Sequence, residues 1–230
     1  MKIKTILTIL FISLFVVGNS QVKPFRFGVK VAPDLAWLAP DTKGYENDGT
    51  NFGFSWGFMA DIALTENYFV KSGFSLDYLS SRLKYPHQME IEEDTETGIL
   101  YRKYKLRYLE IPATLKMRTN KFGNAAYFGE IGFGANLNLR AKSEDEFSYD
   151  NGQSVLESDE DIKDDITFIY GSLVVGAGME YFIDESTSLL LSLNFKNGLS
   201  DILKGTNAID PELKQKAVLY YFQLNVGVMF

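Results

Sequence analysis

His87 is the only imidazole of the chain and the first residue to consider for catalysis. It follows Pro86 and lies near Glu90, but a general base needs a partner within hydrogen-bond distance, which spacing alone does not supply. With one histidine and no cysteine, multi-histidine metal sites, zinc–thiolate sites, disulfides and thiol catalysis are excluded. We therefore expect a non-enzymatic protein without catalytic residue, metal or cofactor, in which His87 is a solvated loop residue.

A larger set of titratable residues occupies every second position of several apolar segments. Alternate residues of a strand point to opposite faces, so these charged side chains share one face. Such a face could line a selective pore, or its charges could pair and fill an interior. Charges removed from bulk water must pair, so we expect a structural network of ion pairs in which Glu110 is an anchor. The candidate network consists of Arg26, Lys30, Asp61, Lys71, Asp77, Glu110, Lys116, Arg118, Glu130, Arg140, Glu180 and Lys196.

A third set is an acidic run over residues 143–165, where ten carboxylates stand against Lys163 alone. We expect a solvated, mobile surface loop and a candidate recognition surface. Calcium is an alternative ligand because it takes clustered carboxylates, although the spacing of an EF-hand is absent. The candidate residues are Glu144, Asp145, Glu146, Asp159, Glu160, Asp161, Asp164 and Asp165.

Composition limits the classes of protein to which the chain can belong. Its 230 residues are 46% hydrophobic, which is enough to bury a core and excludes wholesale disorder. The formal net charge of −7 argues against a nucleic-acid partner, because such binding depends on Lys and Arg neutralising phosphates.

The first twenty residues have the pattern of an export signal. Lys2 and Lys4 precede an apolar run over residues 6–17, and small residues Gly18 and Ser20 precede a cleavage site before Gln21. This run is shorter than the about 20 apolar residues that span a bilayer. We expect residues 1–20 to be a cleaved signal peptide and residues 21–230 to form one exported domain.

Alternation of apolar and polar residues recurs eight times along that domain, most weakly over residues 168–181. At the C-terminus the even positions from Val218 to Phe230 are all apolar, whereas the odd positions are smaller and more polar. This face exceeds the usual length of a soluble strand and fits the about 9–11 residues of a tilted membrane strand. The terminal Phe230 resembles the assembly signal that the barrel-assembly machinery of outer membranes reads. The expected strands cover residues 25–32, 52–64, 68–78, 109–118, 130–140, 168–181, 189–196 and 217–230.

The spacing between these strands distinguishes a membrane barrel from a soluble sandwich. Short connections at 65–67, 120–124 and 184–187 alternate with long ones at 38–51, 86–98, 141–165 and 201–215, as in outer-membrane barrels. Aromatic residues at the ends beside the short turns suit a lipid headgroup zone: Phe25, Tyr68, Tyr127, Tyr181 and Phe230. The sequence therefore predicts an all-β fold, a transmembrane eight-stranded antiparallel up-and-down β-barrel, whose apolar face contacts outer-membrane lipid.

One segment breaks the alternation. The even positions Tyr104, Leu106 and Tyr108 are apolar, but from Leu109 onward the odd positions are. A change of phase within one strand indicates a β-bulge, which we expect near Tyr108–Leu109 at the outer rim.

The run Tyr108-Leu109-Glu110-Ile111-Pro112-Ala113-Thr114-Leu115-Lys116 resembles the "YLEIPLLLK" stretch of an outer-membrane β-barrel family of Bacteroidota that includes PorT, a component of type IX secretion. Residues 27–30 and 129–134 are similar to that family as well, but only the first run is specific. The resemblance implies an eight-stranded outer-membrane barrel, usually without an assigned activity.

Three functional classes follow for a protein of the outer membrane. The first is a side-chain-filled barrel with a structural role or a surface partner. The others are a small-solute channel and an enzyme that depends on His87. An accessory role in type IX protein secretion, with contacts to the secretion machinery, is a further alternative. We expect the first.

Overall fold

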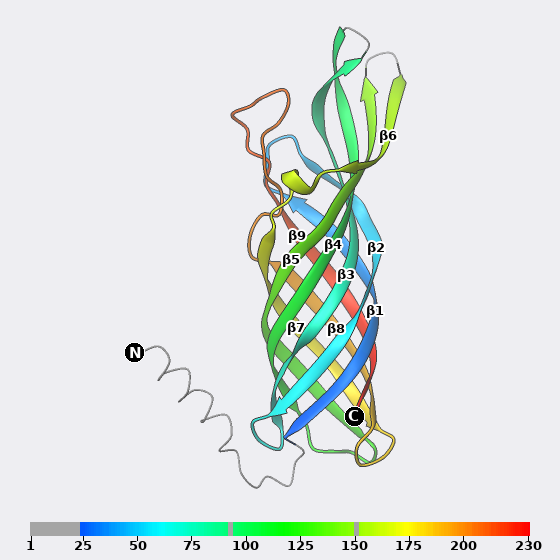
Figure 1. Cartoon of the computed structure of the whole chain (residues 1–230), viewed down its shortest axis with the longest axis vertical. Coiled ribbons are helices and arrows are strands. Elements are labelled where there is room, and N and C mark those ends of the chain that lie inside the picture. The colour runs from blue at the N-terminus through cyan, green and yellow to red at the C-terminus, as the bar shows by residue number, and fades with distance from the viewer. Residues whose placement is uncertain (1–23, 92–93, 150–151) are drawn as a thin grey trace, which may run out of the picture.

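The computed structural model describes residues 24–91, 94–149 and 152–230. The expected signal peptide, residues 1–20, lies outside the described residues. Within them the chain forms a tall barrel of antiparallel strands (Figure 1). The strands are β1 Phe25–Pro40, β2 Glu46–Ala63, β3 Tyr68–Ile91, β4 Asp94–Arg118, β5 Ala125–Tyr149, β6 Gln153–Asp161, β7 Ile169–Phe182, β8 Ser188–Gly198 and β9 Ala217–Met229, with one 3-10 turn, η1, at Lys163–Asp165.

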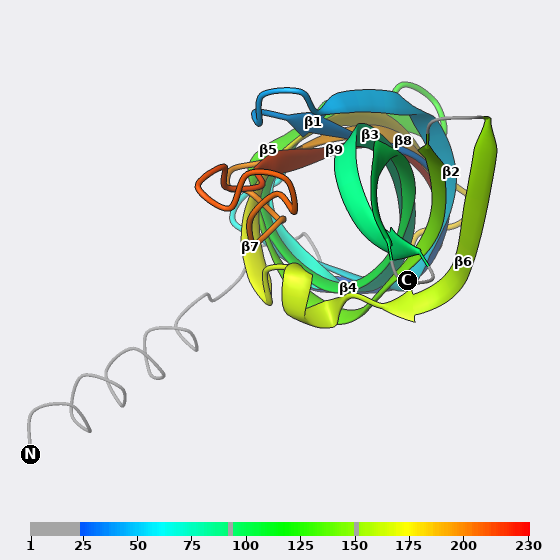
Figure 2. The ribbon, with the colours of Figure 1, turned by 90° about the horizontal axis from the view of Figure 1, so that it is seen from above.

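Eight of these strands close a ring. Each of β1, β2, β3, β4, β5, β7, β8 and β9 pairs antiparallel with two neighbours, and the β1–β9 and β4–β5 pairs leave no free edge within the ring. The view from above shows the closed ring with β6 outside it (Figure 2). β6 pairs only with β5, over Lys142–Tyr149. The predicted eight-stranded antiparallel up-and-down barrel is confirmed.

The predicted faces of the strands are also confirmed. On β1, Phe25, Phe27, Val29 and Val31 are exposed, while Arg26 and Lys30 between them are buried. The same alternation holds on the other ring strands, because the outward side chains must meet hydrocarbon and the inward ones meet one another. The aromatic residues beside the short turns all point outward, each more than two-fifths exposed: Phe25, Tyr68, Tyr127, Tyr181 and Phe230.

β4 corrects the expected change of phase. Tyr104, Leu106 and Tyr108 are buried inside the barrel, in line with Glu110 and Lys116 below them, so β4 keeps one phase throughout. The medium that surrounds the strand changes instead, from lipid below Tyr108 to water above it. From Leu109 to Met117 the outward residues are mostly apolar and the inward ones polar, whereas just above Tyr108 the inward residues Tyr104 and Leu106 are apolar and the outward Lys103, Lys105 and Arg107 are charged.

A bulge is present at the expected height, but on the neighbouring strand. Arg107 pairs with Arg140 and Tyr108 pairs with Asn138, which leaves Leu139 of β5 without a partner. Because Leu139 is the extra residue, both Leu139 and Arg140 point outward. Arg140 therefore lies on the outer wall and is no member of the lumen network.

The short connections are turns as predicted, but three of the four long ones are mostly strand. The first is shortened because β1 extends to Pro40 and β2 begins at Glu46. β3 and β4 continue as a hairpin to Ile91 and Asp94, and β5 and β6 form a second hairpin. Both hairpins rise above the barrel at the end opposite the short turns (Figure 1). Only the connection between β8 and β9 is a long irregular loop, held by isolated bridges such as Thr206 to Lys214. No helix in the described part of the chain is long and apolar enough to cross a membrane.

Candidate functional site

The lumen within the membrane is filled by ion pairs arranged in layers. Near the short turns, the ammonium of Lys116 is fully buried and donates to Asp61 at 2.6 Å and to Glu180. Arg26 Nη1 reaches the same Glu180 carboxylate at 2.9 Å, and Arg118 Nη1 reaches it at 3.3 Å. These contacts join β1, β2, β4 and β7 across the barrel.

The middle layer is centred on Glu130. Lys71 Nζ donates to Glu130 Oε2 at 2.8 Å, and Asn194 Nδ2 donates to Glu130 Oε1 at 2.6 Å. All three side chains are buried, so the Glu130 carboxylate is shielded from water. The ammonium of Lys71 and the amide of Asn194 take the place of its hydrating water. This layer links β3, β5 and β8.

The upper layer is centred on Lys196, whose ammonium donates to Glu110 and lies 3.9 Å from Asp77. Ser75 Oγ donates to Glu110 Oε2 at 3.1 Å, and Tyr221 Oη donates to Asp77 at 3.1 Å. Glu110, the expected anchor of the network, therefore contacts Lys196 of β8. It takes no part in the bulge.

Eleven of the twelve expected network residues lie inside the barrel, together with one carboxylate that was not expected. Asp34 of β1 is fully buried and accepts a hydrogen bond from Ser55. Continuing the alternation of β1 two residues past Ala32 would have found it. With Asp34 inside and Arg140 outside, the charges of the described lumen balance. They are the cations Arg26, Lys30, Lys71, Lys116, Arg118 and Lys196, and the carboxylates Asp34, Asp61, Asp77, Glu110, Glu130 and Glu180.

Little free space remains between these side chains. A cavity of about 20 Å³ lies among Lys30, Lys71, Glu110 and their neighbours, which is room for about one water molecule. Among the described residues no carboxylate forms an ion pair with Lys30, which donates instead to Gln223 and Asn225, both at 3.0 Å. The arrangement pairs the buried charges with one another and with neighbouring polar side chains.

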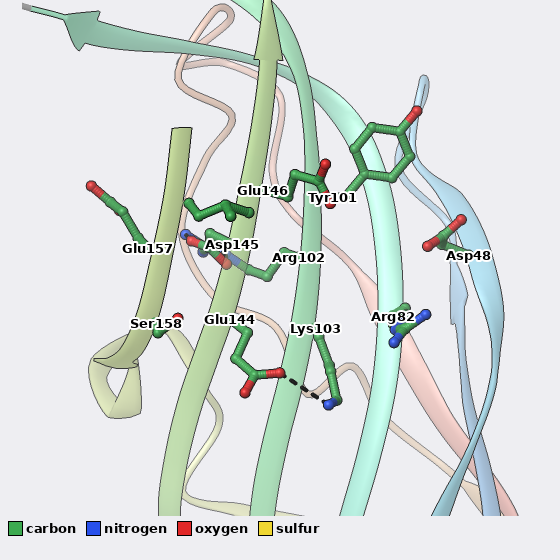
Figure 3. Close-up of a pocket in the computed structure, with 11 residues that line it drawn as sticks. Asp48, Arg82, Tyr101, Arg102, Lys103, Glu144, Asp145, Glu146, Glu157 and Ser158 are labelled. Atoms are coloured by element: carbon green, nitrogen blue, oxygen red, sulfur yellow. Dashed lines mark hydrogen bonds and ion pairs between the residues drawn. The ribbon is translucent and has the colours of Figure 1, made fainter. Parts of the chain in front are cut away.

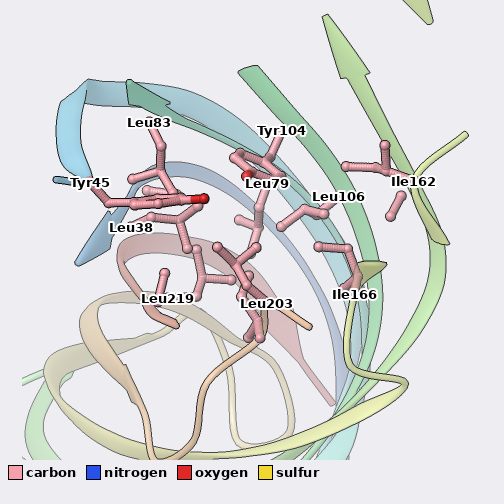
Figure 4. Close-up of a cluster of buried hydrophobic side chains, with 14 of the residues drawn as sticks. Leu38, Tyr45, Leu79, Leu83, Tyr104, Leu106, Ile162, Ile166, Leu203 and Leu219 are labelled. Atoms are coloured by element: carbon pink, nitrogen blue, oxygen red, sulfur yellow. The ribbon is translucent and has the colours of Figure 1, made fainter. Parts of the chain in front are cut away.

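An apolar cluster closes the barrel above the ion pairs. Tyr45 stacks on Tyr85 with ring centroids 4.2 Å apart. Ile166, just after η1, and Leu203, in the connection between β8 and β9, add to the cluster (Figure 4). Burial raises the pKa of Tyr104 to about 12, so its phenol is neutral at physiological pH. The labelled members of the cluster are Leu38, Tyr45, Leu79, Leu83, Tyr104, Leu106, Ile162, Ile166, Leu203 and Leu219.

The acidic run was expected to be a solvated surface loop, but most of it is folded as the β5–β6 hairpin and part of it is paired. Asp145 is buried and accepts from Arg102 Nη2 at 2.6 Å, while Glu144 bridges Lys103 at 3.0 Å and Lys105 (Figure 3). The partners come from β4, which the composition of the run itself cannot reveal. Asp159 contacts Lys142. Of the predicted recognition residues, those that stay exposed without a described ion pair are Glu146, Glu160, Asp161, Asp164 and Asp165.

No group of three or more His, Asp or Glu side chains that could hold a metal occurs within residues 24–91, 94–149 and 152–230.

His87 lies on β3 at the mouth of the barrel, not in a loop. Its half-buried ring meets Tyr85 and Phe147 edge-on at 6.1 Å, and burial together with the charge of Arg102 lowers its pKa. Its Nδ1 has no hydrogen-bond partner among the described residues. Asp165 and Lys204 line the same concave mouth of about 430 Å³.

Phe230 lies at the short-turn end, where its backbone NH donates to Phe27 O at 2.7 Å and its ring packs 5.8 Å from that of Phe27. Its role as an assembly signal stays a prediction.

Solved structures similar to this chain are bacterial outer-membrane barrels. They include neisserial surface protein A, 14% identical over 90% of this chain and 96% of that one, with a TM-score of 0.42. OprG from Pseudomonas aeruginosa is 10% identical over 90% and 97%, with a TM-score of 0.48. Ail of Yersinia pestis is 14% identical over 90% and 100%, with a TM-score of 0.37. No curated protein matches the sequence.

A family model described as "Outer membrane protein beta-barrel domain" matches residues 18–204, more than half of the chain. The match covers β1 to β8 and the lumen residues those strands carry. This chain therefore belongs to the outer membrane protein beta-barrel domain family and is a β-barrel of the cell outer membrane.

Proposed function

We propose that this protein is a non-enzymatic, non-conducting barrel that anchors a structured platform for a partner at the cell surface. The observation that carries the proposal is the double closure of the lumen, by balanced ion pairs within the membrane and by the apolar cluster above them. An eight-stranded barrel has an interior just wide enough to be filled by side chains. The membrane part then serves as support, and the two hairpins present the surface.

The platform carries a defined chemistry. β6 and the following turn expose carboxylates that no described cation neutralises, among them Glu157, Glu160 and Asp161. Surface charge acts mainly on the rate and specificity of association. A basic surface on the partner fits this platform.

Planar-bilayer recording tests the closed lumen. The purified full chain is expected to give no discrete conductance steps, with a porin in the same bilayer as positive control. Reproducible steps that scale with added protein would overturn the proposal and favour the small-solute channel.

Co-purification from native outer membrane tests the platform with two matched double variants. Glu157→Gln/Glu160→Gln removes two charges from β6, and Glu66→Gln/Glu185→Gln removes two from the short turns at the opposite end. A surface partner is expected to be lost with the first variant and retained with the second. The reverse result would contradict the surface platform and favour a periplasmic partner.

The second candidate is an accessory role in type IX secretion, which rests on the resemblance of residues 108–116. The inward residues of this run, among them Glu110 and Lys116, are committed to the lumen ion pairs, so the run has a structural use whatever the role. Deletion of the gene would retain secreted cargo in the periplasm if this candidate is correct.

A further inference from the structure

The outer wall of β4 and β5 carries like charges directly opposite one another. Arg107 of β4 pairs with Arg140 of β5, and Lys105 pairs with Lys142 two rungs above. All four side chains point outward on one face, because the bulge at Leu139 turns Arg140 to the outside. Like charges on opposite residues of a ladder destabilise it, so this arrangement has a cost that the fold itself does not explain.

Intramolecular carboxylates neutralise only the lysines of this group. Lys105 pairs with Glu144 and Lys142 pairs with Asp159. Neither Arg107 nor Arg140 has a carboxylate within ion-pair distance in the described part of the chain, and Nε of Arg107 has no hydrogen-bond partner there. Two neighbouring guanidinium groups are left for an external anion.

The four cations surround a hollow rather than a flat wall. A surface pocket of about 390 Å³ is lined by Tyr78, both lysines and both arginines, with Asp159 at its upper side. The guanidinium carbon of Arg107 lies 4.6 Å from the centre of the Tyr78 ring. This stacking positions the guanidinium before any ligand binds, which reduces the cost of ordering it.

The hollow sits at the upper boundary of the lipid-facing belt. The rung below it is apolar on all three strands, because Leu76 pairs with Leu109 and Leu109 with Leu137. The β4 strand rises about 3.3 Å per residue and tilts about 40°, so from Met117 to Arg107 it climbs roughly 25 Å, the height of an apolar belt. Arg107 and Arg140 therefore lie at the level of the lipid headgroups on the side of the long hairpins.

We propose that this hollow binds the phosphorylated headgroup of a lipid in the outer leaflet of the outer membrane. Guanidinium groups bind phosphate oxygens through paired hydrogen bonds, and two of them facing each other suit a dianionic group. The leucine rung beneath offers a surface for acyl chains. A phosphate in the hollow also neutralises the opposed arginines, which accounts for their pairing.

Native mass spectrometry of the full chain in a non-ionic detergent tests the site, with bisphosphorylated lipid A as probe and its dephosphorylated form as reference. We expect the phosphorylated probe to bind about tenfold more tightly. Arg107→Gln/Arg140→Gln should abolish this preference. Lys163→Gln/Lys204→Gln removes the same charge from exposed sites elsewhere and should retain it.

Folding of each variant is checked by its heat-dependent migration in gels, and both variants alter only side chains outside the lumen. Equal affinity of the wild type for both probes would overturn the proposal, as would a preference that survives in the double arginine variant. Full displacement of the lipid by inorganic phosphate at equal concentration would also overturn it, since the site would then recognise the free anion.

Discussion

Lys71 on β3 and Glu130 on β5 form an ion pair of 2.8 Å across the lumen, past the intervening strand β4. Both side chains are buried, so removing one partner leaves the other charge without compensation. Glu130→Ala is expected to lower the free energy of unfolding by about 3–5 kcal/mol. Urea unfolding in lipid vesicles, followed by tryptophan fluorescence, measures it.

The double variant Lys71→Met/Glu130→Leu separates the pair from the space that it fills. An apolar replacement of both partners is expected to recover most of the stability that Glu130→Ala loses. A double variant as unstable as the single one would show that the hydrogen bond from Asn194 to Glu130, not the ion pair, holds this layer.

Leu224 of β9 tests which face meets lipid. Its side chain is 42% exposed, opposite Leu193 of β8 at mid-height of the belt. Leu224→Lys is expected to cost about 2–4 kcal/mol, because an ammonium there must enter hydrocarbon. Leu156 lies on β6 and is 72% exposed, so Leu156→Lys should leave the free energy of unfolding almost unchanged. Equal losses of unfolding free energy at the two sites would contradict the assigned membrane belt.

The membrane part of the fold could be predicted from the sequence because hydrocarbon imposes one rule on every strand. Each outward residue must be apolar, so a period of two runs uninterrupted through β1, β8 and β9 and fixes which face is which. The lumen charges, such as Lys116 and Glu180, follow from the same period as the residues of the other face.

Above the membrane this rule reverses, and prediction from local pattern fails. Tyr104 and Leu106 are apolar because water lies outside them, and the barrel there buries its apolar face as a soluble protein does. The bulge at Leu139 compounds the difficulty, since a register shift between two strands can be placed on either of them. The partner of Asp145 is a residue of another strand, Arg102, which no local composition indicates.

Deletion of single residues tests the bulge. Removing Leu139 leaves Asn138 inward and Arg140 outward, which restores regular alternation without moving the rungs above or below. We expect this variant to fold and to migrate as a compact barrel before heating. Removing Ile131 instead inverts the side chains of β5 between the deletion and the bulge and turns Asn136 and Asn138 toward lipid, so it should not assemble.

If both deletions assemble equally well, Leu139 is not the residue that absorbs the shift.

His87 gives the barrel mouth a pH dependence whose sign is set by burial. Burial, aided by the positive charge of Arg102, lowers its pKa in the folded protein below the usual 6.5. Between the folded pKa and about pH 6.5, the unfolded chain binds a proton that the folded chain does not. The free energy of unfolding is therefore highest above about pH 6.5 and falls as the pH drops through the folded pKa. As the only histidine, His87 gives a single imidazole signal in NMR titration, which reports the folded pKa directly. His87→Gln should remove the part of the loss of stability between pH 7 and 5 that His87 causes. A measured pKa at or above 6.5 would instead place the ring in solvent, outside the aromatic contacts with Tyr85 and Phe147.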